Sequence, residues 1–219
     1  MGRLSLVDEA YSEIRARIVD GRIPPGSRIT VRPIADQLQL SATPIKAALA
    51  VLEREGVIVS QLHRGFFVPE LSDRDMREIY EMREALDSMA AQLAAGHAAE
   101  DASGTSALYR LCDEQEAYLD RDEIDGYRQS DVDFHRQLWL ASGNQRILRA
   151  GEPLLDQMLL SNALSARQPG RGHQSLAEHR GIVDAIRAGD AARAAELARE
   201  HIRRSHRSFD DALAAETAD

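Results

Sequence analysis

One stretch decides the fold of the first third of the chain: residues 41–56, which read SATPIKAALAVLEREG. Ser41 is a residue type that often caps the start of a helix, and Pro44 is tolerated in a first turn, where its missing N–H has no partner to lose. Gly56 is typical of a helix end. The stretch therefore predicts a helix that is marked at both ends.

The apolar residues of this helix lie on one face. Ile45, Leu49 and Leu52 recur at the spacing of a buried stripe. At the N-terminal end of the helix, the residues outside this stripe are small or polar and carry few charges: Ala42, Thr43, Lys46 and Ala47. We expect this exposed end to contact a partner.

Two helices precede this one, and two β-rich runs follow it. Apolar spacing predicts helices over residues 4–19 and 32–39. Between them, GRIPPGSRIT predicts a turn that leads into a short extended segment at residues 28–30. After Gly56, VIVSQLHRGFFVP predicts a two-stranded hairpin with a turn around residues 63–65. Three helices and a hairpin are the organisation of a winged helix-turn-helix.

The rest of the chain carries only helical signals. A long amphipathic pattern begins at Ser72 or Asp73 and ends near Gly96. The further predicted helices cover residues 103–119, 125–142, 145–165, 173–188 and 190–213, with breaks at Gly126, Gly143, the RQPGRG loop and Gly189. The predicted fold is therefore mainly α, with a winged helix-turn-helix over residues 1–70 and an all-α bundle over residues 71–219, closely coupled by a short boundary.

Composition agrees with this organisation. The chain has 219 residues, of which 43% are apolar, and no apolar run approaches the roughly 20 residues that span a bilayer. The sequence start lacks the pattern of a secretory signal, and the single cysteine, Cys112, cannot form an internal disulfide. We therefore expect no membrane contact and a cytoplasmic location.

The net charge of −9 is unevenly distributed. Residues 1–70 hold nine Lys or Arg against eight Asp or Glu, whereas residues 71–219 hold eighteen against twenty-eight. A nearly neutral domain can still bind phosphates when its cations lie on one face. The acidic total therefore does not exclude a nucleic-acid partner.

Polar residues occur where a winged helix-turn-helix would meet DNA. Arg32 begins the second helix, Thr43 and Lys46 lie at the start of the third, and His63 and Arg64 lie at the hairpin tip. In this fold one helix reads base edges in the major groove, while its neighbour and the wing contact phosphates. Ordinary solvated residues are the alternative, and the hairpin favours DNA binding.

Two stretches resemble a known family. VRPIADQLQLSATPIKAALAVLEREGVIVSQLHRGFFV, residues 31–68, is similar to the DNA-binding signature of GntR-family bacterial transcription regulators. LSDRDMREIYEMREAL, residues 71–86, resembles the start of the FCD ligand-binding domain of the FadR subgroup. The resemblance covers essentially the whole chain and implies a regulator that binds double-stranded operator DNA.

The resemblance and the helix pattern together give one set of DNA-binding residues: Arg32, Ser41, Thr43, Lys46, His63, Arg64 and Gly65. Ala42 and Lys46 stand where relatives carry arginines. Arginine can take both O6 and N7 of guanine, whereas lysine brings a point charge and alanine only a methyl group. We therefore expect an operator that differs from the usual one. Because one helix-turn-helix reads few base pairs, we expect a homodimer on a palindrome, with the bundle as the dimer platform.

A second group of residues predicts a metal site in the bundle. Asp131 and His135 are four residues apart, on one face of a helix. His179 and His201 straddle the break at Gly189, so in an antiparallel pair each lies about eleven residues, or ~16 Å, from the turn. Three imidazoles and a carboxylate suit a divalent ion such as Zn²⁺ or Ni²⁺. A packed or surface histidine is the alternative for each one alone.

The FCD resemblance implies the same four metal ligands. It also places Arg83 near the bound effector of relatives, where arginine could grip a carboxylate with two hydrogen bonds. An ordinary ion pair with Glu84 or Asp87 is the alternative.

These features predict a transcription regulator, a repressor or an activator, whose metal-containing bundle senses a small carboxylic or sugar acid. A metal that is itself the signal, or is purely structural, is the second interpretation. A metal-dependent hydrolase is the third. Its base would be Glu152 or Glu178, but Glu178 points about 100° away from His179 on the helix, and no HExxH, Ser-His-Asp or phosphate-loop motif is present. We therefore expect no enzyme.

Overall fold

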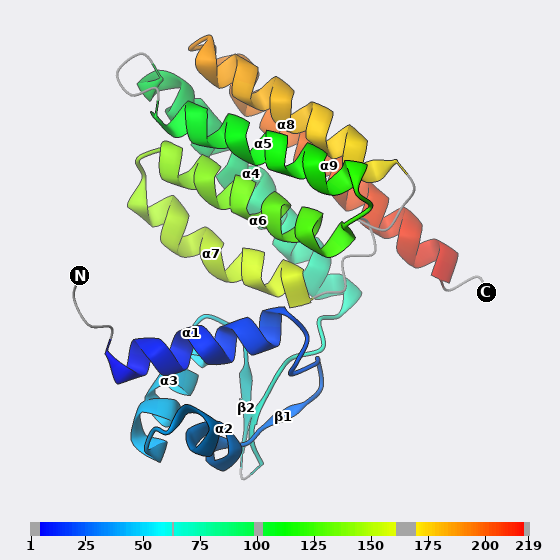
Figure 1. Cartoon of the computed structure of the whole chain (residues 1–219). Coiled ribbons are helices and arrows are strands. Elements are labelled where there is room, and N and C mark those ends of the chain that lie inside the picture. The colour runs from blue at the N-terminus through cyan, green and yellow to red at the C-terminus, as the bar shows by residue number, and fades with distance from the viewer. Residues whose placement is uncertain (1–4, 63, 99–102, 161–169, 217–219) are drawn as a thin grey trace. The chain divides into compact units, whose positions relative to one another are not determined.

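The computed structural model describes residues 5–62, 64–98, 103–160 and 170–216. The chain divides into two compact units, Met1–Ser72 and Asp73–Asp219 (Figure 1). Each unit has its own set of buried hydrophobic side chains. Among the described helices, none has an apolar stretch long enough to cross a membrane.

Three helices form the core of the first unit: α1 (Leu6–Val19), α2 (Val31–Leu38) and α3 (Ala42–Arg54). α3 packs against both α1 and α2. The predicted stripe of α3 is confirmed, because Ile45, Leu49 and Leu52 are fully buried. α1 buries Ala10, Ile14 and Ile18 against it. Burial of the leucine and isoleucine side chains, each worth about 1.5–3 kcal/mol, stabilises the unit.

The small sheet has three strands and not the two that the sequence predicts. β1 (Arg28–Ile29), β2 (Val59–Gln61) and β3 (Gly65–Phe67) are antiparallel in the order β1-β3-β2. The extended segment before α2 pairs with the outer edge of β3, with Ile29 opposite Phe66. The pairing gives hydrogen-bond partners to the backbone N–H and C=O groups on the edge of β3 that faces away from β2. Ile29 is buried as a result.

A tight turn connects β2 and β3. The Arg64 N–H donates to the Gln61 carbonyl at 2.9 Å. Gly65 follows with φ of +95°, a conformation that side chains disfavour, which explains the glycine at this position. His63 lies outside the described residues.

The second unit is an all-helical bundle, so the predicted fold class is confirmed. Its helices are α4 (Asp73–His97), α5 (Ser103–Asp120), α6 (Ile124–Ala141), α7 (Gln145–Leu160), α8 (Arg171–Arg187) and α9 (Ala191–Glu216). α5, α6 and α7 are neighbours in that order, and α8 lies along α9 (Figure 1). α4 packs against α6, α7, α8 and α9. Phe134, Leu138 and Trp139 of α6 are fully buried in the core.

The predicted break at Gly126 is wrong, because this residue lies inside α6. The chain turns earlier, at residues 121–123, where Asp122 has φ of +55°. A Cβ at Gly126 would lie 2.4 Å from the ring of Tyr118 on α5. The glycine therefore serves close packing of two helices, and it does not end one.

The other helix ends agree more closely with the sequence. The breaks at Gly143 and Gly189 are confirmed. α8 begins at Arg171, two residues earlier than predicted, and its N-terminal cap is Gly170. The last part of the predicted helix 145–165, from residue 161, lies outside the described residues.

Candidate metal and effector site

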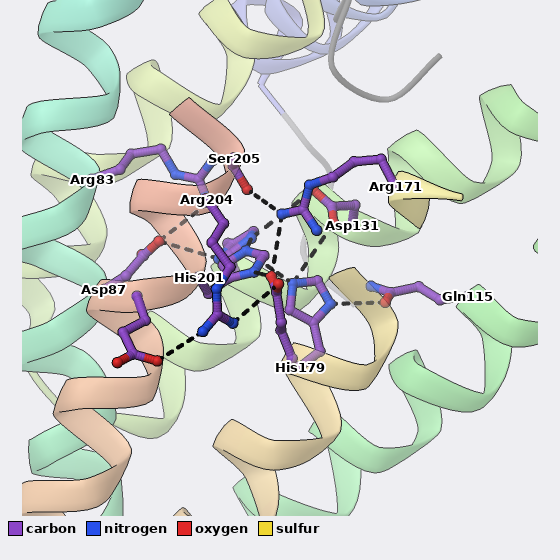
Figure 2. A network of polar contacts seen from close by, with 12 residues as sticks. Arg83, Asp87, Gln115, Asp131, Arg171, His179, His201, Arg204 and Ser205 are labelled. Atoms are coloured by element: carbon purple, nitrogen blue, oxygen red, sulfur yellow. Dashed lines mark hydrogen bonds and ion pairs between the residues drawn. The ribbon is translucent and has the colours of Figure 1, made fainter. Parts of the chain in front are cut away.

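Three histidines from three helices meet inside the bundle. They are His135 on α6, His179 on α8 and His201 on α9, and their side chains are at most 3% exposed. The Nε2 atoms of His179 and His201 are 3.2 Å apart, and those of His201 and His135 are 3.4 Å apart. The predicted meeting of α8 and α9 at the same level is confirmed. Figure 2 shows His179 and His201 at the centre of a network of polar contacts.

Asp131 lies beside these nitrogens, one turn before His135. Its Oδ1 is 3.8 Å from Nε2 of His179, and its Oδ2 is 4.0 Å from Nε2 of His135. The side chain is 24% exposed, so it stands on the solvent side of the cluster. The four residues predicted as metal ligands are therefore brought together.

The outer nitrogen of each histidine faces an acceptor. Nδ1 of His179 is 2.9 Å from Oε1 of Gln115, whose amide nitrogen donates to the Ser130 carbonyl. Nδ1 of His201 is 2.7 Å from Oε2 of Glu178.

The third histidine faces a carboxylate as well. Nδ1 of His135 lies 3.2 Å from Oδ2 of Asp87, within ion-pair distance although not aligned as a hydrogen bond. Acceptors on this side favour a proton on each Nδ1. The three Nε2 lone pairs then point at one another.

This donor set fits a metal ion. Lone pairs that face one another at 3.2–3.4 Å repel unless a cation lies between them. Nitrogen ligands at about 2.0–2.1 Å from a divalent ion are themselves about 2.8–3.0 Å apart in octahedral geometry and about 3.3–3.4 Å apart in tetrahedral geometry. The three histidines thus form a group that could hold such an ion.

Burial sets the protonation of the cluster. It holds the pKa values of His135 and His179 well below the usual value, and neighbouring cations add to the shift. Burial also raises the pKa values of Asp87 and Asp131, against the opposing effect of nearby positive groups. The imidazoles of His135 and His179 are therefore neutral, which is the form that binds metals.

A cavity of about 60 Å³ opens beside the histidines. Its walls include Asp131, His135 and His201, together with three arginines: Arg83, Arg128 and Arg171. Arg83 is 2% exposed and donates from Nη2 to Asp87 at 3.1 Å. Arg83 thus makes the ion pair with Asp87 that the sequence offers as the alternative, although the pair is buried. It also lines the cavity, and its contact with an effector stays a prediction.

Sequence reasoning missed Arg171 and the contact made by Glu178. Arg171 belongs to RQPGRG, whose glycines and proline indicate a loop, yet it starts α8 and is 6% exposed. The angle of Glu178 to its neighbour His179 gave no hint that it reaches His201 on α9. For the contacts around the site, the sequence offered one usable signal, the spacing of four residues that predicts the ion pair between Arg83 and Asp87.

The residues predicted to contact DNA are exposed where the structure describes them. Those on the second and third helices are Arg32 on α2, and Ser41, Thr43 and Lys46 at the start of α3. Ser41 occupies the N-cap of α3, although its hydroxyl makes no capping hydrogen bond. On the wing, Gly65 is exposed, and the guanidinium of Arg64 lies 5.5 Å from the ring centre of Phe67.

Comparison with known proteins assigns both units. The family described as bacterial regulatory proteins of the gntR family matches residues 6–68, and the FCD domain matches residues 78–204. The chain is 30% identical over 206 residues to an uncharacterized HTH-type transcriptional regulator, BphR, of Paraburkholderia xenovorans, covering 92% of this chain and 84% of that protein.

Two further comparisons agree. A probable D-xylose utilization operon transcriptional repressor of Paenarthrobacter nicotinovorans is 28% identical, over 91% of this chain and 87% of that protein. The solved structure of McbR/YncC from E. coli has a TM-score of 0.81 at 20% identity, over 99% of this chain and 100% of that one, and so shares the fold. The chain belongs to the GntR family, in its FCD-containing branch, and is a DNA-binding transcription regulator and not an enzyme.

Proposed function

We propose that this regulator holds a divalent metal ion, Zn²⁺ or Ni²⁺, in its helical unit. The ligands are Asp131, His135, His179 and His201. The convergence of three buried Nε2 atoms carries this proposal. A divalent ion would stabilise the facing lone pairs and would offer an open position to an oxygen atom of a small ligand.

The signal is a small carboxylic or sugar acid that binds in the cavity beside the histidines, where Arg83 grips its carboxylate. The arginines of the cavity wall support this assignment, because a site that sensed or stored the metal alone would have no use for them. They favour the acid over the metal as the signal.

The first unit binds a palindromic operator as part of a homodimer. Base and phosphate contacts come from Arg32, Ser41, Thr43, Lys46, His63, Arg64 and Gly65. Two exposed methionines support dimerisation through the helical unit, since Met82 and Met89 lie two turns apart on α4 and are 50% and 49% exposed. A footprint without two-fold symmetry would contradict the dimer.

Metal content tests the site first. We expect about one divalent ion per chain in the purified protein. His179→Ala should lose most of it, whereas His173→Ala should not, because His173 is exposed on the same helix. Equal metal in wild type and His179→Ala would rule out the ligand set.

A thermal-shift screen of organic and sugar acids on the metal-loaded protein tests the signal. An acid that binds should raise the melting temperature by mass action and should change operator affinity. Arg83→Gln should weaken its binding. If no acid acts, but chelation alone releases the operator, the metal is the signal.

A further inference from the structure

The cavity beside the histidines has arginines on more than one wall. Arg83 comes from α4, Arg128 from α6 and Arg171 from α8. In the view of Figure 2, Arg83 and Arg171 approach the histidine cluster from opposite sides. Arginines on different walls suit a ligand that presents an acceptor group to each of them.

Arg171 has unused hydrogen-bonding capacity. Its Nη2 donates to Oγ of Ser205 at 2.8 Å and to Oε2 of Glu178 at 3.2 Å. Its Nη1 is buried and has no hydrogen-bond partner among the described residues. A buried N–H of a charged group that has no acceptor costs free energy of folding. The unpaired Nη1 therefore indicates that a ligand supplies the acceptor.

Arg83, on the α4 wall of the cavity, also lacks good acceptors for its guanidinium N–H groups. Its Nη2 donates to Asp87, but its Nη1 faces the sulfur of Met158 at 2.7 Å, and a thioether is a weak acceptor. Its Nε is buried without a hydrogen-bond partner in the described part of the chain. Two buried guanidinium groups on separate walls therefore each lack an acceptor.

The charges of the site point the same way. The buried or partly buried groups around the cavity are Arg83, Arg128 and Arg171, and Asp87, Asp131 and Glu178. Asp125 is 3.8 Å from Arg128 but is fully exposed, so solvent screens its charge. Arg204 pairs with Glu178 at 3.2 Å but is 44% exposed, so solvent screens its charge as well. The three positive and three negative groups named first then balance, and the double charge of a divalent ion would remain uncompensated. A dianion would neutralise it.

We propose that the effector is a short dicarboxylate, with one carboxylate held by Arg83 beside the metal ligands and the second held by Arg171. This inference rests on the proposed function and narrows it from an organic acid to a dianion. A cavity of about 60 Å³ has room for only a few water-sized groups, which favours a chain of about two to four carbons.

Calorimetric titration of the metal-loaded, full-length protein with matched acids tests this proposal. The pairs are malonate against propionate and succinate against butyrate, which differ within each pair by one carboxylate. We expect one dicarboxylate to bind at least tenfold more tightly than its partner. Arg171→Gln should remove that preference and leave the affinity for the monocarboxylate unchanged, whereas Arg83→Gln should weaken both.

Arg180→Gln is the matched control, because Arg180 lies on α8 as well but pairs with Glu116 away from the cavity. It should keep the full preference. If Arg171→Gln loses its metal or fails to fold, Arg171→Lys replaces it, and a partial preference is expected because lysine keeps the charge but not the planar fork.

The outcomes separate the two proposals. Equal affinities within both pairs, or equal losses for both acids in Arg171→Gln, overturn the dicarboxylate assignment and leave a monocarboxylate effector standing. Binding of none of the four acids, with the metal present, also overturns the short dicarboxylate, and the screen of organic and sugar acids then tests the carboxylate effector separately.

Discussion

Glu178 joins the histidine cluster to the arginine wall of the cavity. Its Oε2 accepts from His201 at 2.7 Å and from Arg171 at 3.2 Å, and its Oε1 accepts from Arg204 at 3.2 Å. Burial raises the pKa of Glu178, but hydrogen bonds and charges from these three partners outweigh burial and lower it. A permanent carboxylate at this position orients the imidazole of His201.

We expect Glu178→Gln to reduce metal affinity about 10–100-fold, because partners of ligating histidines typically contribute that much. Competition with a metal-binding dye measures the effect. Glu200→Gln is the control, since Glu200 also pairs with Arg204 and makes no described contact with a histidine. Similar losses in both variants would show that the charge, and not the hydrogen bond to His201, matters.

The thiol of Cys112 should be inert in the folded protein. The residue is fully buried in the bundle core, and burial raises its pKa to about 12, so the reactive thiolate is scarce at pH 8. A thiol-reactive dye at pH 8 should label the native protein far more slowly than the protein unfolded in guanidinium. Rapid labelling of native protein would contradict the buried position.

At the scale of the element, α5 and α6 approach closely where Gly126 faces Tyr118. We expect Gly126→Ala to lower the free energy of unfolding by about 1–3 kcal/mol, because the new methyl would overlap the ring. Gly96→Ala is the matched control, since a Cβ at Gly96 of α4 meets nothing within 4 Å. Chemical denaturation measures both, and equal effects would contradict the packing role.

The leading end of α3 carries the second prediction at this scale. Lys46→Arg restores a planar fork, and it should increase the preference for guanine at one position of each half-site by about 1–3 kcal/mol. Arg54→Lys, an exposed exchange in the last turn of the same helix, should leave base preference unchanged. Selection from a randomised operator library measures the base preference of both variants. An unchanged preference in Lys46→Arg would contradict a role of this end of α3 in base recognition.

The helices were largely predictable because capping residues, glycines and apolar periodicity are local signals. Gly189 marks the turn between α8 and α9, and the spacing of His179 and His201 around it was sufficient to place them together. The extended segment at residues 28–30 was predicted, but its pairing with β3 was not, since two residues carry no signal for a partner strand. The glycines and proline around Arg171 predict a loop, so the sequence did not indicate that this residue is buried. The contact of Glu178 with His201 depends on how α8 and α9 face each other, which the sequence does not specify.

At the scale of the whole molecule, effector and operator should be coupled. Thermodynamic linkage requires that an acid which changes operator affinity by some factor, typically about 5–150-fold, has its own affinity changed by the same factor when operator is bound. Titrations of the acid with and without operator DNA measure this. An acid whose affinity is indifferent to operator, although it binds in the cavity, would show that this ligand is not the signal.

Five helices each contribute a group to the histidine cluster: Asp87 from α4, Gln115 from α5, His135 from α6, His179 from α8 and His201 from α9. The set is complete only when α4, α5, α6, α8 and α9 have packed together, so an ion that uses it would hold five helices in place. We expect the metal-loaded bundle to open more rarely than the metal-free bundle, and slower hydrogen exchange of its core amides would show this.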